Sequence, residues 1–328
     1  MTEKSGRRRM GWLGWTGAVV LLALLGLGAL TWWALDNDSA ATLDSLDAKF
    51  SRSTTITQVA AASYADDPAQ KLEMFVPAGT APGTGWPLVV FFHGGGWHEG
   101  NPHDYHWIAR ALAEKGYATA LVGYRLNKPG RFPAMLLDSA AGTRWALGHA
   151  PAHKIDPARV VLMGHSAGGY NASMLSLDRQ WLGREGVPEG TVKGAVVLAG
   201  PADFYPFEKK SSINAMSHWP RPADTQPVNF VRADAPPMLL VHGTEDTIVR
   251  PRNAIILARK LTEAGVPTRA VLIEGRAHIA MVVTLAHPFD YWDHRVADAI
   301  FPFLARVLPP NPAPAPAPAS SPVQPAAR

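Results

Sequence analysis

The segment Gly164-His165-Ser166-Ala167-Gly168-Gly169 carries the pattern G-x-S-x-G. The run 159–163, which is apolar after Arg159, stands directly before it and predicts a buried strand, and residues 167–177 after it are compatible with a helix. A serine on a sharp turn from a strand into a helix is the setting of a nucleophile elbow, which exposes the hydroxyl at the top of the sheet. We therefore take Ser166 as the candidate nucleophile; the alternative is an ordinary glycine-rich turn.

A glycine-rich loop, His93-Gly94-Gly95-Gly96-Trp97, follows the apolar residues 88–92. Glycines let the backbone approach a substrate closely and turn its N–H groups inward, as an oxyanion hole requires. We expect the N–H groups of Gly95, Gly96 and Ala167 to form this hole. His93 is expected to brace the loop by hydrogen bonding.

A base and an acid stand downstream of the serine, each just after a candidate strand. His278 is expected to take the proton of Ser166, and Asp246 is expected to hold the imidazole in the correct tautomer and to stabilise its cation. Two alternative acids are Glu245, the neighbour of Asp246, and Asp203, which follows the candidate strand at residues 195–198.

Other histidines are assigned no chemistry. His98, His103 and His106 lie in one loop, but no glutamate-containing helical motif accompanies them, so we do not predict a metal site there. His165, inside the elbow, is expected to support packing. Neither a metal nor an organic cofactor is expected.

Short apolar runs alternate with segments of helical periodicity between about residues 58 and 308. This alternation predicts an α/β fold with a mostly parallel sheet covered by helices on both faces. The candidate strands are residues 72–76, 88–92, 118–123, 159–163, 195–198, 238–241 and 269–273, and the candidate helices are residues 104–115, 133–149, 167–177, 251–264 and 289–307. Ligands of such sheets bind at the carboxyl ends of the strands, where the candidate catalytic residues stand.

Four motifs appear in a fixed order along the chain: HGGGW at residues 93–97, GHSAGG at 164–169, HGTEDTIV at 242–249 and GRAH at 275–278. In this order they resemble the α/β-hydrolase superfamily, and within it the hormone-sensitive-lipase-like carboxylesterases and the bacterial feruloyl-esterase-like proteins. The resemblance implies an α/β-hydrolase fold and ester hydrolysis through an acyl-enzyme, with Ser166, Asp246 and His278 as the triad.

One departure from this branch concerns the cap. Hormone-sensitive-lipase-like enzymes often carry a substantial N-terminal cap, whereas this chain has a polar segment in that place. Residues 204–234, which include Trp219 and Phe230, are expected to supply a small lid instead. A small lid favours an open site for small or aryl esters.

The N-terminal region predicts a membrane anchor. Residues 10–35, from Met10 to Leu35, contain no charged side chain and would span about 39 Å as a helix. Arginines precede the segment and aspartates follow it, which predicts a cytoplasmic N-terminus and a catalytic domain on the periplasmic or extracellular side. The alternative is a signal peptide cleaved near Ser39-Ala40-Ala41, which would release a secreted protein.

The remaining organisation follows from composition. Residues 1–9 are expected to form a cytoplasmic stub, 36–57 a stalk, 58–308 the catalytic domain and 309–328, rich in Pro and Ala, a disordered tail. Four basic residues and one acidic residue precede position 10, which leaves 27 basic and 26 acidic residues in the rest of the chain. This near-neutral body predicts no nucleic-acid partner. Cysteine is absent, so disulfides and thiolate chemistry are excluded.

The sequence thus predicts a membrane-anchored serine carboxylesterase with a small-molecule ester as substrate. Two alternatives stay open. An aryl formamidase or amidase would use the same fold and the same triad. A catalytically silent hydrolase fold could serve as an envelope tether or binding module.

Overall fold

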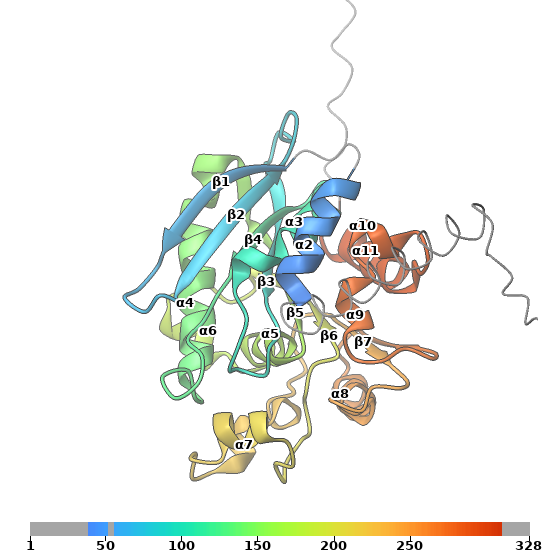
Figure 1. Cartoon of the computed structure of the whole chain (residues 1–328). Helices are drawn as coiled ribbons and strands as arrows, with labels where there is room; N and C mark the ends of the chain where they lie inside the picture. The colour runs from blue at the N-terminus through green and yellow to red at the C-terminus, as the bar shows by residue number, and fades with distance from the viewer. Residues whose placement is uncertain (1–38, 52–55, 310–328) are drawn as a thin grey trace, which may run out of the picture.

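The computed structural model describes residues 39–51 and 56–309. One eight-stranded sheet runs through this part of the chain in the order β1-β2-β4-β3-β5-β6-β7-β8 (Figure 1). Strand β2 is antiparallel to β1 and to β4, and the other neighbouring pairs are parallel, which confirms the mostly parallel sheet. The strands are β1 Ile56–Ser63, β2 Lys71–Pro77, β3 Trp86–Phe92, β4 Ala118–Val122, β5 Ile155–His165, β6 Val192–Leu198, β7 Met238–Gly243 and β8 Thr268–Ile273.

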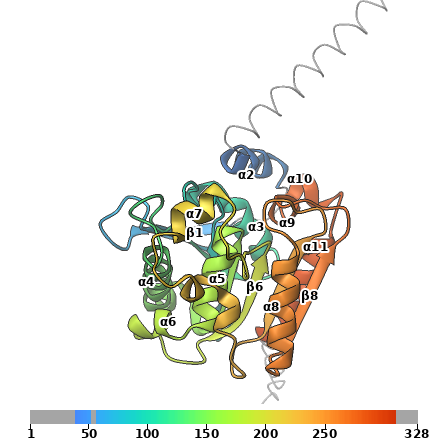
Figure 2. The same cartoon turned by 90° about the horizontal axis from the view of Figure 1, so that it is seen from below.

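Helices cover both faces of the sheet (Figures 1 and 2). They are α2 Ser39–Phe50, α3 His106–Ala113, α4 Ala134–His149, α5 Ala167–Leu177, α6 Gln180–Arg184, α7 Lys210–Met216, α8 Arg252–Glu263, α9 Ala280–Val283, α10 His287–Asp290 and α11 Arg295–Val307. Side chains alternate along each strand. Val90 of β3 therefore packs on the face covered by α4 and α5, whereas Phe91 packs on the face of α3 and α11.

Each strand that the sequence predicts is present, with ends that differ by a few residues. The first strand, β1, was not predicted. Its sequence ITQVAAAS is rich in alanine, and its residues are half-buried or exposed because β1 is an edge strand. The predicted helix at residues 289–307 is divided into α10 and α11.

The stalk prediction is wrong for residues 39–50. These residues form α2, which packs against α3 and α10 (Figures 1 and 2). Its Leu43 is buried in the core, and the Asp47 side chain is completely covered. The polar composition suggested a stalk, whereas Asp44 and Asp47 face cationic partners on the domain.

Two aspartates of α2 bind one arginine of α3. Arg110 donates from Nε to Asp47 at 2.5 Å and from Nη2 to Asp44 at 2.6 Å. Asp47 also accepts from the backbone N–H and from Nδ1 of His287, at 2.6 and 2.9 Å. Burial alone would raise the pKa of Asp47, but the hydrogen bonds from His287 and Arg110 outweigh it and hold this pKa below its ordinary value. The carboxylate therefore stays ionised and anchors α2 to the domain.

The predicted membrane segment, residues 10–35, and the predicted tail beyond residue 309 lie outside the described residues. Within residues 39–51 and 56–309, no helix has the length and apolarity needed to cross a bilayer.

Candidate active site

Ser166 stands on a strained turn between β5 and α5. Its backbone has φ 54° and ψ −118°, a conformation that L-residues rarely adopt. Two glycines make the turn possible, because a Cβ on Gly164 would clash with the carbonyl of Gly168, and a Cβ on Gly168 would clash with the carbonyl of Phe92. The G-x-S-x-G spacing therefore follows from backbone crowding around the serine.

Three predicted residues meet through two short hydrogen bonds. Ser166 Oγ lies 2.8 Å from His278 Nε2, and His278 Nδ1 lies 2.7 Å from Asp246 Oδ2. All three side chains are largely buried. With the Nδ1 proton donated to Asp246, Nε2 is left as the acceptor for the serine hydroxyl. This tautomer is the one that a general base for Ser166 requires.

Asp246 is held by donors on both of its oxygens. Oδ1 accepts the backbone N–H groups of Ile248 and Val249, each at 2.9 Å, and Oδ2 lies 3.2 Å from His242 Nε2 in addition to its bond with His278. Burial alone would raise the pKa of Asp246, but the hydrogen bonds from His242 and His278 outweigh it and keep this pKa well below its ordinary value. The carboxylate is therefore ionised at neutral pH.

The two alternative acids occupy other positions. Glu245 is exposed, although it is adjacent to Asp246. The backbone N–H of Asp203 donates to Asn253 Oδ1 at 2.9 Å, in a turn that packs against α8. Among the described residues, Asp246 is the acid that hydrogen-bonds His278.

The glycine-rich loop is folded back on its own backbone. The Gly95 carbonyl accepts the N–H groups of His98 and Glu99, at 3.0 and 3.1 Å, and the positive φ of Gly95, 105°, suits this turn. A Cβ on Gly95 would collide with the Glu99 carbonyl. Gly95, Gly96 and Ala167 line the same cavity as Ser166 and His278, as their predicted role requires.

His93 lies beneath this loop. Its Nδ1 lies 2.7 Å from the Gly94 carbonyl, and its ring stacks on Tyr124 with the centroids 4.5 Å apart. Burial lowers the pKa of His93 to about 4, so the ring is neutral and Nδ1–H donates to Gly94. The Tyr124 hydroxyl in turn donates to the His93 carbonyl at 2.8 Å. These contacts fit the predicted bracing of the loop.

A cavity of about 640 Å³ opens over the serine. Trp97 and Phe204 form an aromatic part of its wall, with their ring centroids 6.3 Å apart. Ile248 and Ile279 form an aliphatic part. Residues 204–212 of the predicted lid contribute Phe204, Pro206, Glu208, Lys209, Ser211 and Ser212 to the lining. Trp219, also expected in the lid, instead packs against Phe132 with the ring centroids 5.0 Å apart.

Two supporting features were missed by sequence reasoning. His242 Nε2 donates to the Val249 carbonyl at 2.7 Å and so closes the turn that carries Asp246. Asp293 accepts from Arg276 Nε at 2.6 Å and from Arg295 Nε at 2.8 Å, which ties the loop of His278 to the start of α11. His242 stands in the same HGTED stretch as Asp246, and that proximity was the available signal.

His165 supports the loop of His278 from the elbow. Its Nε2 donates to the His278 carbonyl at 3.2 Å, and the two rings are 4.8 Å apart. Burial, together with the neighbouring His278, lowers the pKa of His165 to about 3, so this ring stays neutral. The contact fits the predicted supporting role.

The BD-FAE family model matches residues 72–261, more than half of the chain. The chain belongs to the BD-FAE family. The matched range contains the glycine-rich loop, Ser166 and Asp246, and it ends before His278. This BD-FAE member is therefore an α/β-hydrolase, as the order of its motifs predicted.

Several curated relatives of this BD-FAE protein carry esterase names. They include the esterase LipC of Mycobacterium tuberculosis, 26% identical over 223 residues (60% of this chain, 53% of the relative), and a probable isoprenylcysteine alpha-carbonyl methylesterase of Arabidopsis thaliana, 24% identical over 240 residues (66% and 49%). The chain spans about half or less of the length of the first curated relatives it matches.

Solved structures show the same fold. A bacterial heroin esterase superposes with a TM-score of 0.65 at 24% identity, covering 83% of this chain and 91% of its own. An esterase of the Planctomycetes species Thermogutta terrifontis superposes with a TM-score of 0.63 at 22% identity, covering 77% and 94%. Both are similar to the BD-FAE domain over almost their full lengths.

Proposed function

We propose that this protein is a serine carboxylic ester hydrolase that works through an acyl-enzyme. The observation that carries the proposal is the hydrogen-bonded chain from Ser166 through His278 to Asp246, which opens into a cavity of ligand size. The esterase names of the relatives agree with it. Ester hydrolysis needs a nucleophile, a base and an anion site, and the cavity brings candidates for all three together.

Acylation begins with attack by Ser166 Oγ on the ester carbonyl carbon. The hydroxyl proton moves to His278 Nε2, and ionised Asp246 stabilises the imidazolium that forms. The carbonyl oxygen becomes an oxyanion, which the N–H groups of Gly95, Gly96 and Ala167 receive. The amino end of α5 adds a favourable dipole, because this helix starts directly after Ser166.

The imidazolium then gives its proton to the departing alcohol. Water takes the place of the alcohol and loses a proton to His278 Nε2 as it attacks the acyl carbon. Collapse of the second tetrahedral intermediate releases the acid and returns the proton to Ser166.

We infer a preference for small or aryl esters. The cavity has aromatic wall at Trp97 and Phe204, and its volume of about 640 Å³ matches a small organic ligand. A panel of nitrophenyl esters of increasing acyl length tests this preference. Turnover should fall from acetate and butyrate to palmitate, and a maximum at long chains would contradict the inference.

Aryl formamide hydrolysis is a second candidate, because a kynurenine formamidase of Danio rerio is 28% identical over 144 residues (44% of this chain). Paired assays on an aryl acetate and the matching aryl formamide separate the two activities. We expect a higher kcat/KM for the ester, with both activities abolished in Ser166→Ala. Faster formamide cleavage would move the assignment to amide chemistry.

We propose as well that residues 10–35 anchor the chain in a membrane, with the N-terminus cytoplasmic and the catalytic domain outside. The apolar length and the flanking charges support the anchor. Alkaline extraction of membranes, followed by N-terminal sequencing of the protein, tests it. A protein found in the soluble fraction with its N-terminus near Ala40 would favour the cleaved signal peptide.

A further inference from the structure

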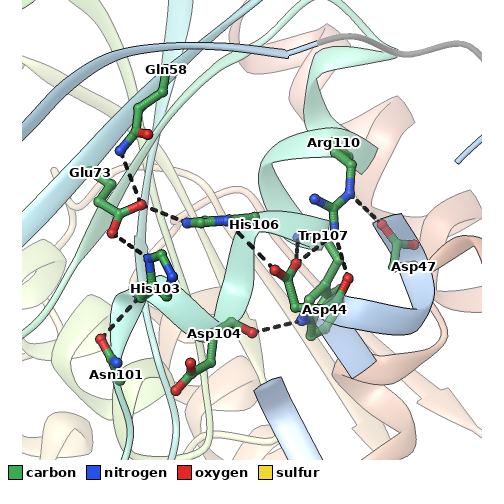
Figure 3. Close-up of polar contacts among 10 residues, drawn as sticks. All are labelled: Asp44, Asp47, Gln58, Glu73, Asn101, His103, Asp104, His106, Trp107 and Arg110. Atoms are coloured by element: carbon green, nitrogen blue, oxygen red, sulfur yellow. Dashed lines mark hydrogen bonds and ion pairs between the residues drawn. The ribbon is translucent and has the colours of Figure 1, made fainter. Parts of the chain in front are cut away.

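Two imidazoles and one carboxylate, none of them a member of the triad, meet in one cluster (Figure 3). Glu73 comes from β2, His103 from the 3-10 helix Pro102–Tyr105, and His106 begins α3. His103 Nδ1 lies 2.9 Å from Glu73 Oε1, and His106 Nε2 lies 2.6 Å from Glu73 Oε2. One donor atom from each residue lies within 4.8 Å of the other two.

These separations suit a metal ion. Zinc takes nitrogen and oxygen ligands at about 2.0–2.2 Å, which places neighbouring tetrahedral ligand atoms about 3.4 Å apart. The two short contacts to Glu73 would therefore lengthen by less than about 1 Å, and the wider separations among the ligand atoms, up to 4.8 Å, would shorten by up to about 1.4 Å. His103 can supply this movement because 65% of its side chain is exposed.

The carboxylate of Glu73 is held between the two imidazoles and the edge strand β1. Gln58 Nε2 donates to Glu73 Oε2 at 3.3 Å and fixes the carboxylate from the edge strand (Figure 3). Glu73 is thus oriented towards both imidazoles.

The second nitrogen of His106 faces another acid. His106 Nδ1 lies 3.6 Å from Asp44 Oδ2 on α2, while Nε2 faces Glu73 (Figure 3). Metal-bound histidines commonly present their free ring N–H to a carboxylate, which fixes the tautomer and makes the ligating nitrogen more basic. His106 faces Asp44 on that side of its ring, at an ion-pair distance of 3.6 Å that is longer than a hydrogen bond.

We propose that Glu73, His103 and His106 bind a divalent transition-metal ion, for which Zn²⁺ is the natural probe, with water completing the coordination. Two imidazoles and one carboxylate form a ligand set that zinc accepts. Asn101, Asp104 and Tyr105, which flank His103, line the catalytic cavity. The ion would therefore join one wall of the cavity to β2 and, through Asp44, to α2. The bound ion would stabilise the folded chain and fix the position of this cavity wall.

The test measures Zn²⁺ binding to the metal-free full chain by titration calorimetry, with Co²⁺ absorption in the visible region as a report on coordination. We expect one saturable site. Its affinity should fall at least tenfold in Glu73→Gln and in His103→Ala. The matched control is His98→Ala, which removes an exposed histidine of the same loop that lies outside the cluster. Its affinity should equal that of the natural chain.

Thermal unfolding in chelator-treated buffer shows that each variant is folded before the titration. Zn²⁺ should raise the unfolding temperature of the natural chain and of His98→Ala, but not that of His103→Ala. Ser166→Ala should bind Zn²⁺ with the affinity of the natural chain. The metal-site proposal and the hydrolase proposal are therefore tested independently. The absence of a saturable site, or equal affinities in the natural chain and in His103→Ala, would overturn the proposal.

Discussion

Asp246 is a buried carboxylate that remains charged because its donors compensate for the loss of water. The two backbone N–H groups beyond it, His242 and His278 occupy both of its oxygens. In the proposed mechanism, its role is to fix the His278 tautomer, with the proton on Nδ1.

Asp246→Asn tests that role. The amide can hold His278 in the opposite tautomer, with the proton on Nε2, where it can no longer accept from Ser166. We expect kcat to fall by roughly 10³–10⁴-fold with little change in KM, measured on an aryl acetate at pH 7. Glu245→Gln is the matched control and should keep activity within about twofold. Equal losses of kcat in the two variants would show that Asp246 is not the acid of the triad.

In the proposed mechanism, His242 positions the acid and takes no part in the reaction itself. Its Nε2–H is shared between the Val249 carbonyl and Asp246, which fixes the turn that carries the acid. In His242→Ala we expect kcat to fall by roughly 10- to 100-fold with KM nearly unchanged, and unfolding to become easier by about 1–3 kcal/mol because the partly buried Val249 carbonyl loses its donor. Kinetics and urea denaturation measure the two effects. Unchanged kcat would make His242 merely structural.

At the scale of elements, helix α2 is held to the domain by charge. Asp47 accepts hydrogen bonds from Arg110 of α3 and from His287 of α10. His287 Nε2 also lies 2.5 Å from Glu114 Oε1. The hydrogen bond with Asp47 raises the pKa of His287 to about 9, with a further contribution from Glu114 and in spite of burial.

This raised pKa predicts that α2 docking weakens at alkaline pH. The ordinary histidine pKa is 6.5, so the stability gained from the protonated ring is complete below that pH and is lost as the pH rises through about 9. The difference in unfolding temperature between the natural chain and His287→Ala should be largest at pH 6 and should shrink as the pH rises through about 9, because only the neutral ring's contacts are left at pH 10. Melting curves at a series of pH values measure it, and a constant difference would contradict the account.

At the scale of the whole molecule, the sequence predicted the central sheet and the triad because short local sequence patterns indicate both. Apolar runs such as residues 88–92 identify buried strands, and the crowded G-x-S-x-G turn identifies Ser166. Edge and terminal elements were not predicted, because their stability comes from partners distant in the chain. Strand β1 has few strongly apolar residues, and α2 packs by pairing Asp47 with Arg110 and His287.

The supporting residues of the candidate active site and of the proposed metal site were not predicted, for the same reason. Asp293 reaches the loop of His278 only through Arg276 and Arg295, which the fold brings together. The cluster of His103 and His106 lacks a local glutamate in sequence. Its acid, Glu73, comes from a strand 30 residues earlier than His103 and becomes a neighbour only through the pairing of β2 with β4.

The most direct test of the proposed mechanism is covalent labelling of the full chain by a fluorophosphonate, read by intact mass and peptide mapping. Such a probe reports a serine that is activated as a nucleophile. The account predicts one adduct per chain, on Ser166, no adduct in Ser166→Ala, and strongly slowed labelling in His278→Ala. An unlabelled natural chain, or an adduct on another cavity serine such as Ser211, would contradict it and would favour a catalytically silent hydrolase fold or a different nucleophile.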